Sequence, residues 1–203
     1  MSHPAFFDDV ATIVLRDPLA ELLGAAEGGI VEYRYAEAVK LAGHSCPTVA
    51  GAWLMNRRAL AALYPGERPE RGAIRVDFRD AATAGVTGVI AAVTTLITGA
   101  TYDTGFKGLG GRFDRRQRLF FDAAIGGELR FQRLDTGAAV DVSYRPEHVP
   151  PDAALPGLMP KVLAGAASEA EHAEFRRLWQ ERVRRILIEH ADDEALVALT
   201  PLP

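Results

Sequence analysis

The most regular run of apolar positions lies on either side of a Gly-His-Ser-Cys-Pro segment, residues 43–47. Residues 35–41 before it have helical spacing, and Gly43 suits the left-handed conformation in which many helices end. Residues 47–63 after it predict a second helix, because proline is favoured at the first helical position. The glycine and alanines of this second helix indicate close packing against its neighbours. The pattern therefore predicts two helices joined by a tight turn.

Alternation of apolar and polar residues marks the strands. It predicts a half-buried strand over 73–79, which an apolar helix over 86–97 follows. Three further strands are predicted over residues 117–125, 128–134 and 139–144. Glycine-rich segments that suit hairpins separate these strands, and so we expect them to form an antiparallel meander.

The two ends of the chain have weaker patterns. Residues 5–23 predict a helix interrupted near Pro18, and residues 30–33 a short extended piece. Residues 145–160 contain five prolines and predict a linker across the surface. A capping box then opens a long helix over residues 168–190, which has an apolar stripe along one face.

Together these elements predict an α+β fold, with helices around an antiparallel sheet made of the strand near 73–79 and the meander over 117–144. We expect three parts: a helical segment over 1–30, an α+β core over 30–145, and a proline-rich linker with a helical extension over 146–203. The apolar stripe of the last helix needs a partner, which either the core or a second subunit provides. We expect a homodimer.

The composition is that of a folded globular chain, since 48% of the 203 residues are hydrophobic and 25% are charged. The formal net charge of −4 argues against nucleic acid or an anionic membrane as a partner. The most apolar stretch, residues 84–101, is interrupted by glycines and threonines and predicts a buried helix, not a membrane span. Residues 1–9 carry two aspartates and no basic leader, and we expect a cytoplasmic protein.

The only cysteine, Cys46, lies two residues after His44. A single cysteine excludes an internal disulfide and, in a monomer, a metal site made of cysteines alone. If Pro47 opens the helix, Cys46 is its N-cap, where unpaired N–H groups and the helix dipole favour the thiolate. His44 is then near enough to share a metal ion or to exchange a proton. The alternative is a buried, inert cysteine beside a surface histidine.

Further along, the apolar helix runs into a Thr-Gly-Ala-Thr segment, residues 98–101, which Gly105 and an aromatic strand over 118–121 follow. Together with the Gly-His-Ser-Cys-Pro turn and the small residues after it, these pieces resemble the core domain of the FmdE family, which takes its name from formylmethanofuran dehydrogenase. The resemblance covers residues 33–121, which is under half of the chain.

The chain also departs from that family. The glycine that usually follows the Cys-Pro pair is Thr48, no cysteine stands in 79–83, and the family's third cysteine is Ala100. The family's Gly-Lys-Gly-Asn segment reads Asp-Thr-Gly-Phe over 103–106, and its zinc-finger tail is absent. The chain therefore resembles a divergent member of the family that kept the His/Cys turn and lost the other thiols. The dehydrogenase role does not carry over to it.

A tetrahedral zinc site needs three or four ligands, and the turn supplies two, His44 and Cys46. Asp80 and Asp103 are candidates for the others, because each adjoins a family-like segment. Each also has a structural explanation: Asp80 as a strand-end or helix-cap residue, and Asp103 as a turn residue beside Gly105. In the glycine-rich loop over 99–111 and just after it, Lys107 and Arg112 are candidates for binding an anionic cofactor or substrate, although the glycines form neither a Walker loop nor a Rossmann fingerprint.

The sequence thus predicts a small metal-binding protein with His44 and Cys46 as anchor ligands and zinc as the metal. Whether the site is catalytic on a small molecule stays open. The first alternative is a metal-free enzyme with Cys46 as nucleophile and His44 as base. The second is a non-catalytic accessory protein in which the turn only joins two helices. Ligation of haem iron has no attachment motif to support it.

Overall fold

The computed structural model describes residues 3–202. Its helices are α1 (Pro18–Leu22), α2 (Tyr35–Ala42), α3 (Pro47–Leu63), α4 (Thr87–Thr98), α5 (Leu155–Leu163) and α6 (Glu169–Arg184). Its strands are β1 (Ile13–Arg16), β2 (Ile30–Tyr33), β3 (Ile74–Phe78), β4 (Leu119–Phe120), β5 (Leu129–Arg133), β6 (Ala139–Tyr144) and β7 (Val197–Leu202). The shorter turns are the 3₁₀ turns η1 (Ala5–Asp9), η2 (Glu27–Gly29) and η3 (Pro146–His148), and a π-helical turn, η4 (Arg185–Glu189).

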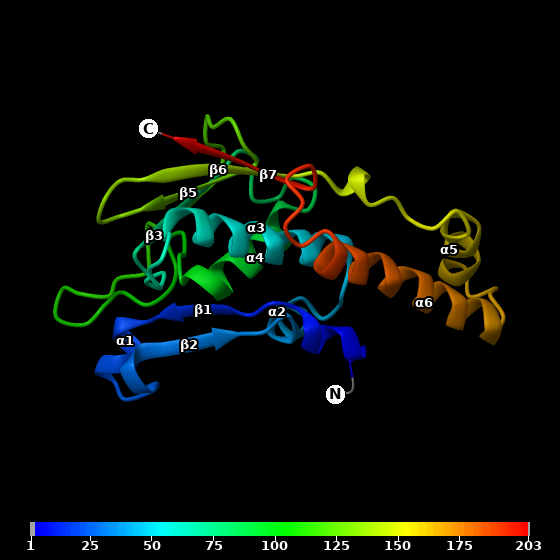
Figure 1. Cartoon of the computed structure of the whole chain (residues 1–203), viewed down its shortest axis with the longest axis horizontal. Helices are drawn as coiled ribbons and strands as arrows, with labels where there is room; N and C mark the ends of the chain where they lie inside the picture. The colour runs from blue at the N-terminus through cyan, green and yellow to red at the C-terminus, as the bar shows by residue number, and fades with distance from the viewer. Residues whose placement is uncertain (1–2, 203) are drawn as a thin grey trace.

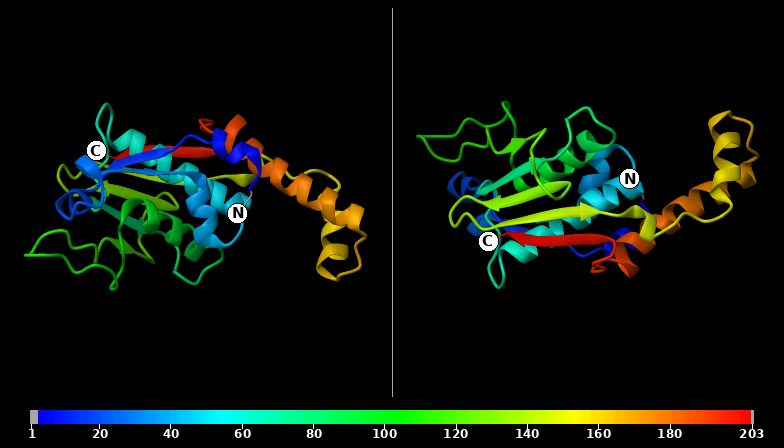
Figure 2. Two further views of the ribbon diagram at one scale, coloured as in Figure 1. Left: turned by 90° about the horizontal axis from the view of Figure 1, so that it is seen from below. Right: turned by 90° about the horizontal axis from the view of Figure 1, so that it is seen from above.

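The body of the molecule has three layers (Figure 1). A five-stranded sheet with the order β4-β3-β5-β6-β7 forms one face. Helices α3 and α4 lie beneath it, and the β1–β2 hairpin with α2 covers the opposite side of these helices. α6 leaves the body and carries α5 at its far end (Figures 1 and 2). The predicted α+β class, with a long C-terminal helix, is confirmed.

Helix α3 is the centre of the core because layers pack on two sides of it. Its largest buried side chains are Trp53, Leu54, Met55 and Leu60. Trp53 meets the ring of Tyr35 in α2 edge-on, and the Asn56 amide donates to the Thr94 hydroxyl of α4 at 3.0 Å. Gly51 allows the sheet to approach closely, since a Cβ there would lie 2.4 Å from the Tyr144 ring. Most of α3 is buried between these layers, and only Ala61 and Ala62 near its end are exposed.

The sheet contains the strands predicted near 73–79, 128–134 and 139–144, but of the strand predicted over 117–125 only β4 forms, and its pairing differs from the expected meander. β4 pairs with β3 in parallel, so β3 lies between β4 and β5. The segment after β4 crosses the end of β3, where the Ala123 N–H donates to the Phe78 carbonyl at 3.0 Å. Gly126 and Gly127 are therefore not a hairpin between neighbouring strands; their N–H groups donate to the Asp141 carboxylate.

The predicted helix over 5–23 is wrong in its middle. Residues 13–16 form β1, in which Ile13 and Leu15 are buried, and β1 pairs with β2. Asp17 then caps the short α1, where its carboxylate accepts from the N–H groups of residues 19 and 20. Pairing with β2 overrides the helical preference of a segment too short to show strand alternation clearly.

The C-terminal part contains more regular structure than a linker and one helix. The proline-rich segment over 145–160 includes η3 and the start of α5, whose Pro156 lies in the first turn, where no N–H partner is needed. The second half of α6 packs on the core through Val183 and the partly buried Trp179, so the core provides the partner for this part of the stripe. Residues 197–202 form the unexpected edge strand β7. None of the helices over 3–202 is long and apolar enough to cross a membrane.

Candidate functional site

The turn between α2 and α3 has the geometry that its residue types predict. Gly43 ends α2 in the left-handed conformation, with φ of 76°. Cys46 is the N-cap of α3, and its sulfur accepts the Val49 N–H at 3.5 Å. Pro47 is the first helical residue. The expected position of the thiol at the helix start is confirmed.

Side chains from three other elements hold this turn in place. Trp179 Nε1 and Gln180 Nε2 of α6 donate to the Ser45 carbonyl at 2.9 and 3.2 Å. The Tyr144 hydroxyl at the end of β6 donates to the Pro47 carbonyl at 3.0 Å. The Tyr35 hydroxyl lies 3.1 Å from Ser45 Oγ. The backbone on both sides of Cys46 is therefore held by α6 and β6, and the Ser45 side chain contacts α2.

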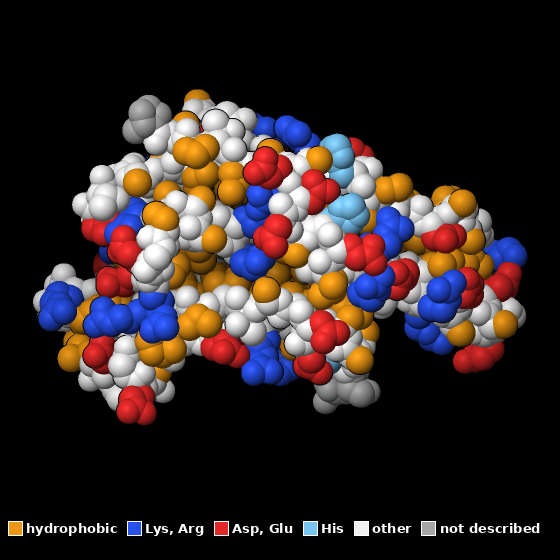
Figure 3. Space-filling model, in the orientation of Figure 1, with side chains coloured by type: hydrophobic (Ala, Val, Ile, Leu, Met, Phe, Trp, Pro, Cys, Tyr) orange, Lys and Arg blue, Asp and Glu red, His pale blue; other side chains and the backbone are white. Residues whose placement is uncertain are grey.

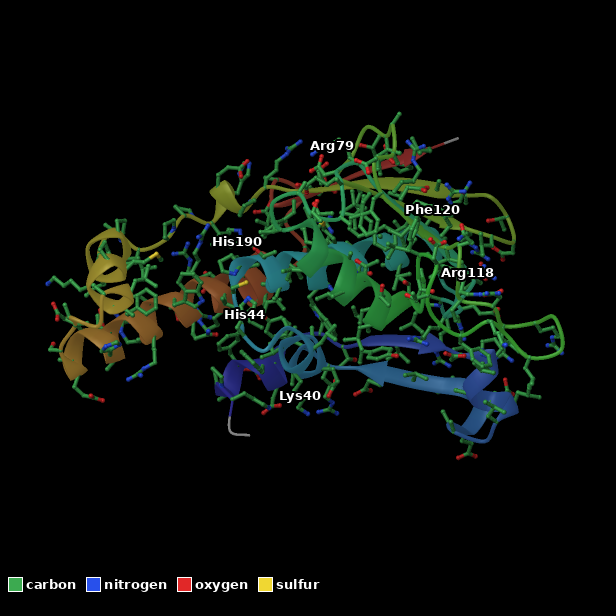
Figure 4. All side chains as sticks on the ribbon, turned by 180° about the vertical axis from the view of Figure 1, so that it is seen from behind. Lys40, His44, Arg79, Arg118, Phe120 and His190 are labelled. Atoms are coloured by element: carbon green, nitrogen blue, oxygen red, sulfur yellow. The ribbon has the colours of Figure 1, made fainter. Side chains whose placement is uncertain are left out.

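The ring of His44 is oriented by a backbone hydrogen bond. Its Nδ1 lies 2.9 Å from the Ala42 carbonyl oxygen, which accepts only, so Nδ1 carries the proton. In the neutral ring Nε2 is then unprotonated and available to a metal ion or as a base, and histidine ligands of metals are commonly oriented in this way. Figure 4 shows His44 beside α6, on the other side of the body from Arg118 and Phe120.

His44 and Cys46 line one cavity of about 530 Å³. Its other lining residues are Pro47, Thr48, Val86, Ile90, Glu128, Tyr144, Pro146, Trp179 and Arg182. The His44 side chain is exposed at this cavity, whereas Cys46 is 8% exposed. This volume is typical of a cavity that takes a small molecule.

The polar groups that sequence reasoning missed in this cavity are Glu128, Tyr144 and Arg182. Glu128 Oε2 accepts the Tyr144 N–H at 2.6 Å. Burial raises the pKa of the Tyr144 phenol, against the opposing effect of Arg182, so the hydroxyl stays protonated at neutral pH. Burial lowers the pKa of the Arg182 guanidinium. No motif marks these residues, because each comes from a different segment of the chain.

Residues 41–197, more than half of the chain, match the family described as FmdE, molybdenum formylmethanofuran dehydrogenase operon. The chain belongs to the FmdE family. No curated protein matches the chain. The match includes the His/Cys turn and Arg182, so the FmdE region of this chain contains every residue that lines the cavity.

Of the two carboxylates proposed as further ligands in this FmdE protein, Asp80 lies nearer the cavity. It lines a neighbouring space of about 200 Å³ that shares Val86, Ile90 and Glu128 with the His44–Cys46 cavity. Its side chain is exposed and accepts from Arg79 Nε at 3.3 Å. Over residues 3–202, no three His, Cys, Asp or Glu side chains form a group that could hold a metal ion.

The other predicted site residues lie in or just after the glycine-rich loop before β4, which projects from the end of the molecule opposite the α5–α6 pair (Figure 2). Asp103 is exposed there and accepts from the Gln117 amide. Lys107 is exposed. Arg112 lies over the Phe113 ring at 4.7 Å and lines a different, smaller space of about 300 Å³ beside α1. The fold does not bring these three residues to His44 and Cys46.

Histidine side chains gather on the face shown in Figure 3 where the body meets the α6 helix, with acidic and basic side chains around them. The α5–α6 pair carries both signs of charge, mixed with hydrophobic side chains. The charge of this face is therefore mixed.

Proposed function

We propose that this FmdE-family protein binds a divalent metal ion, with zinc as the first choice, through His44 and Cys46. The observation that carries the proposal is that both side chains line one cavity while the Ala42 carbonyl orients the imidazole. A cysteine sulfur and an imidazole nitrogen are the ligands that zinc prefers in proteins. When bound, the metal would supply Lewis-acid chemistry to a small molecule in the cavity.

The donor set fits an open site. A catalytic zinc commonly has three protein ligands and one exchangeable position, and His44 and Cys46 provide two. Among the proposed carboxylates, Asp80 is the one whose space adjoins the cavity. Water, a bound small molecule or a second chain would complete the shell. Asp103, which lies in the glycine-rich loop, would have to come from a second chain.

Metal titration tests this proposal. Purified protein treated with a reductant is expected to bind about one Co²⁺ or Zn²⁺ per chain, and the cobalt form to show the absorption band of thiolate coordination. Cys46→Ser should abolish that band, and His44→Ala should weaken metal binding by at least about tenfold, since losing even a group that only orients a ligand typically costs about that much. His148→Ala, which changes an exposed histidine outside the cavity, serves as the control.

Two results of the metal titration would refute the proposed metal site. If neither metal binds, or if Cys46→Ser leaves the cobalt spectrum unchanged, the metal site does not exist. The folded state of each variant is checked by its melting temperature.

A metal-free cysteine enzyme is the second candidate. It is favoured by the absence of a third ligand side chain within residues 3–202 and by the position of Cys46 at the start of α3. Rapid alkylation of Cys46 at mildly acid pH in chelator-treated protein, slowed by His44→Ala, would support this candidate. An alkylation rate equal to that of a free thiol would remove it.

A purely structural role for the turn is the third candidate, favoured by the two bonds that Ser45 accepts from α6. In this case Cys46→Ala would lower the melting temperature and leave metal content and any activity unchanged.

We also propose that the protein is a cytoplasmic homodimer in which the α5–α6 pairs of two copies meet. Leu163 at the end of α5 is 80% exposed, and Phe175 of α6 lines an apolar groove of about 550 Å³. Light scattering should give twice the mass of the chain, and Leu163→Glu combined with Phe175→Glu should halve it. Leu134→Glu, at another exposed leucine, should not. A wild-type monomer at micromolar concentration would refute the dimer.

A further inference from the structure

Arg182 of α6 is held at the wall of the cavity with its orientation fixed. Its Nε donates to the Val149 carbonyl at 2.7 Å, and its Nη2 donates to the Pro146 carbonyl at 2.9 Å. Two bonds to backbone oxygens fix the plane of the guanidinium, so little side-chain entropy remains to be lost when a further partner binds.

The charge of this guanidinium is not neutralised within the described chain. Over residues 3–202, no carboxylate lies within ion-pair distance of Arg182, and its Nη1 makes no hydrogen bond. Of the other arginines of α6, Arg177 and Arg184 each pair with a glutamate, whereas Arg176, like Arg182, has no ion pair over residues 3–202. A half-buried cation costs free energy when it lacks a counter-charge, and a bound anion removes that cost.

The rest of the wall limits what kind of anion fits. Val86, Ile90 and Trp179 present apolar surface, which suits a hydrocarbon or aromatic body. Glu128 lines the same cavity, and its carboxylate would repel a ligand with two negative charges more strongly than a ligand with one. One fixed guanidinium therefore matches one negative charge on an otherwise apolar molecule.

We propose that the cavity binds a small organic monocarboxylate, with the carboxylate on Arg182 and the apolar body against Val86, Ile90 and Trp179. This proposal rests on the proposed function in one respect, that both place the small molecule in the His44–Cys46 cavity. It names the chemical class of that molecule. Neither His44 nor Cys46 is needed to hold the carboxylate.

Calorimetric titration with benzoate and phenylacetate, set against benzamide and phenylacetamide, tests the proposal. The titrations use the full chain with a chelator present, so that their outcome does not depend on a metal. The two acids are expected to bind at least about tenfold more tightly than the neutral amides, as a charge-assisted hydrogen bond implies. Inorganic phosphate, which lacks an apolar body, is expected not to bind measurably.

Variants assign the effect to Arg182. Arg182→Gln should weaken binding of the acids at least about tenfold and leave binding of the amides unchanged. Arg182→Lys, which keeps the charge without the fixed fork, should lose part of the affinity. Arg185→Gln is the matched control, because it removes the same charge from the next turn of the helix outside the cavity and also loses a bond to a backbone carbonyl, that of Pro150. Cys46→Ser should still bind benzoate.

Several results would overturn the proposal. In the wild type, these results are equal binding of the acids and the amides, phosphate binding as tight as that of benzoate, or no binding of either acid at millimolar concentration. In the variants, the result is that Arg182→Gln or Arg182→Lys binds benzoate as tightly as the wild type does. Because the titrations are made without metal, none of these results coincides with failure of the metal site. A failed metal titration likewise leaves this experiment intact.

Discussion

Replacing Asp17 by alanine is expected to destabilise the fold by about 3–5 kcal/mol, the range for removing one partner of a buried ion pair. The Asp17 side chain is 7% exposed, and its two oxygens accept from Arg115 at 2.7 Å and from Arg71 at 3.0 Å. Without the carboxylate, two guanidinium groups face each other across a buried space. The same carboxylate also caps α1.

The comparison of Asp17→Ala with Asp17→Asn separates these two roles. Asparagine keeps a capping oxygen and the side-chain shape but removes the charge. We expect most of the loss to remain in Asp17→Asn, as measured by urea unfolding. Asp192→Asn, at an exposed ion pair with Arg57, is the control and should change the stability little. If Asp17→Asn unfolds like the wild type, the charge of Asp17 contributes nothing.

The contribution of the Asp17 carboxylate to stability depends on pH in a definite direction. Burial alone would raise the pKa of Asp17, but Arg115, Arg71 and the Ala20 N–H together outweigh burial and hold the pKa below its usual value. Stability from this carboxylate is therefore complete above the pKa of about 3.9 in the unfolded chain, and is lost as the pH falls through the lower folded-state pKa. Asp17→Asn should remove that part of the acid-induced loss.

Replacing Gly51 by alanine is expected to destabilise the protein by about 1–3 kcal/mol, the cost of overpacking a core. Elsewhere inside a helix this change usually stabilises by about 0.5–1 kcal/mol. Here the new Cβ would lie 2.4 Å from Cε1 and 2.5 Å from Cδ1 of Tyr144. The ring must move, although its hydroxyl is bonded to Pro47. The same ring lines the His44–Cys46 cavity, so its displacement would also change the shape of that cavity.

A double-mutant cycle tests this explanation. Tyr144→Leu removes the ring, and in that background Gly51→Ala should become neutral or stabilising. The sign of the Gly51→Ala effect should thus reverse between the two backgrounds, as measured by denaturant unfolding. An effect of the same size in both would show that the ring of Tyr144 is not the obstacle.

The His/Cys turn could be predicted because the signals that form it are local. Gly43 ends one helix and Pro47 begins the next, so the position of Cys46 follows from a few neighbouring residues. The long α3 and β3 were also predictable, since each shows its own period over its full length.

The wall of the cavity could not be predicted, because its polar residues come from segments far apart in the chain. Glu128 precedes β5, Tyr144 ends β6 and Arg182 lies near the end of α6. Only the sheet order and the docking of α6 on the core bring them to the start of α3. For the same reason, sequence reasoning could not separate Asp80, whose space adjoins the cavity, from Asp103, which lies in the glycine-rich loop.

The strand β7 was missed because its local sequence argues against a strand. A six-residue segment that contains Pro201 does not look like a strand, since proline cannot donate to a neighbour. It is nevertheless paired with β6, because at the margin of a sheet only one side of the strand needs donors.

The same proline has a consequence for assembly. Pro201 interrupts the row of donors on the outer side of β7, and at the opposite margin β4 is only two residues long. Neither margin offers a stretch on which a strand from another molecule could add, so the sheet resists edge-to-edge aggregation. Copies of this protein that associate are therefore not expected to do so by extending the five-stranded sheet.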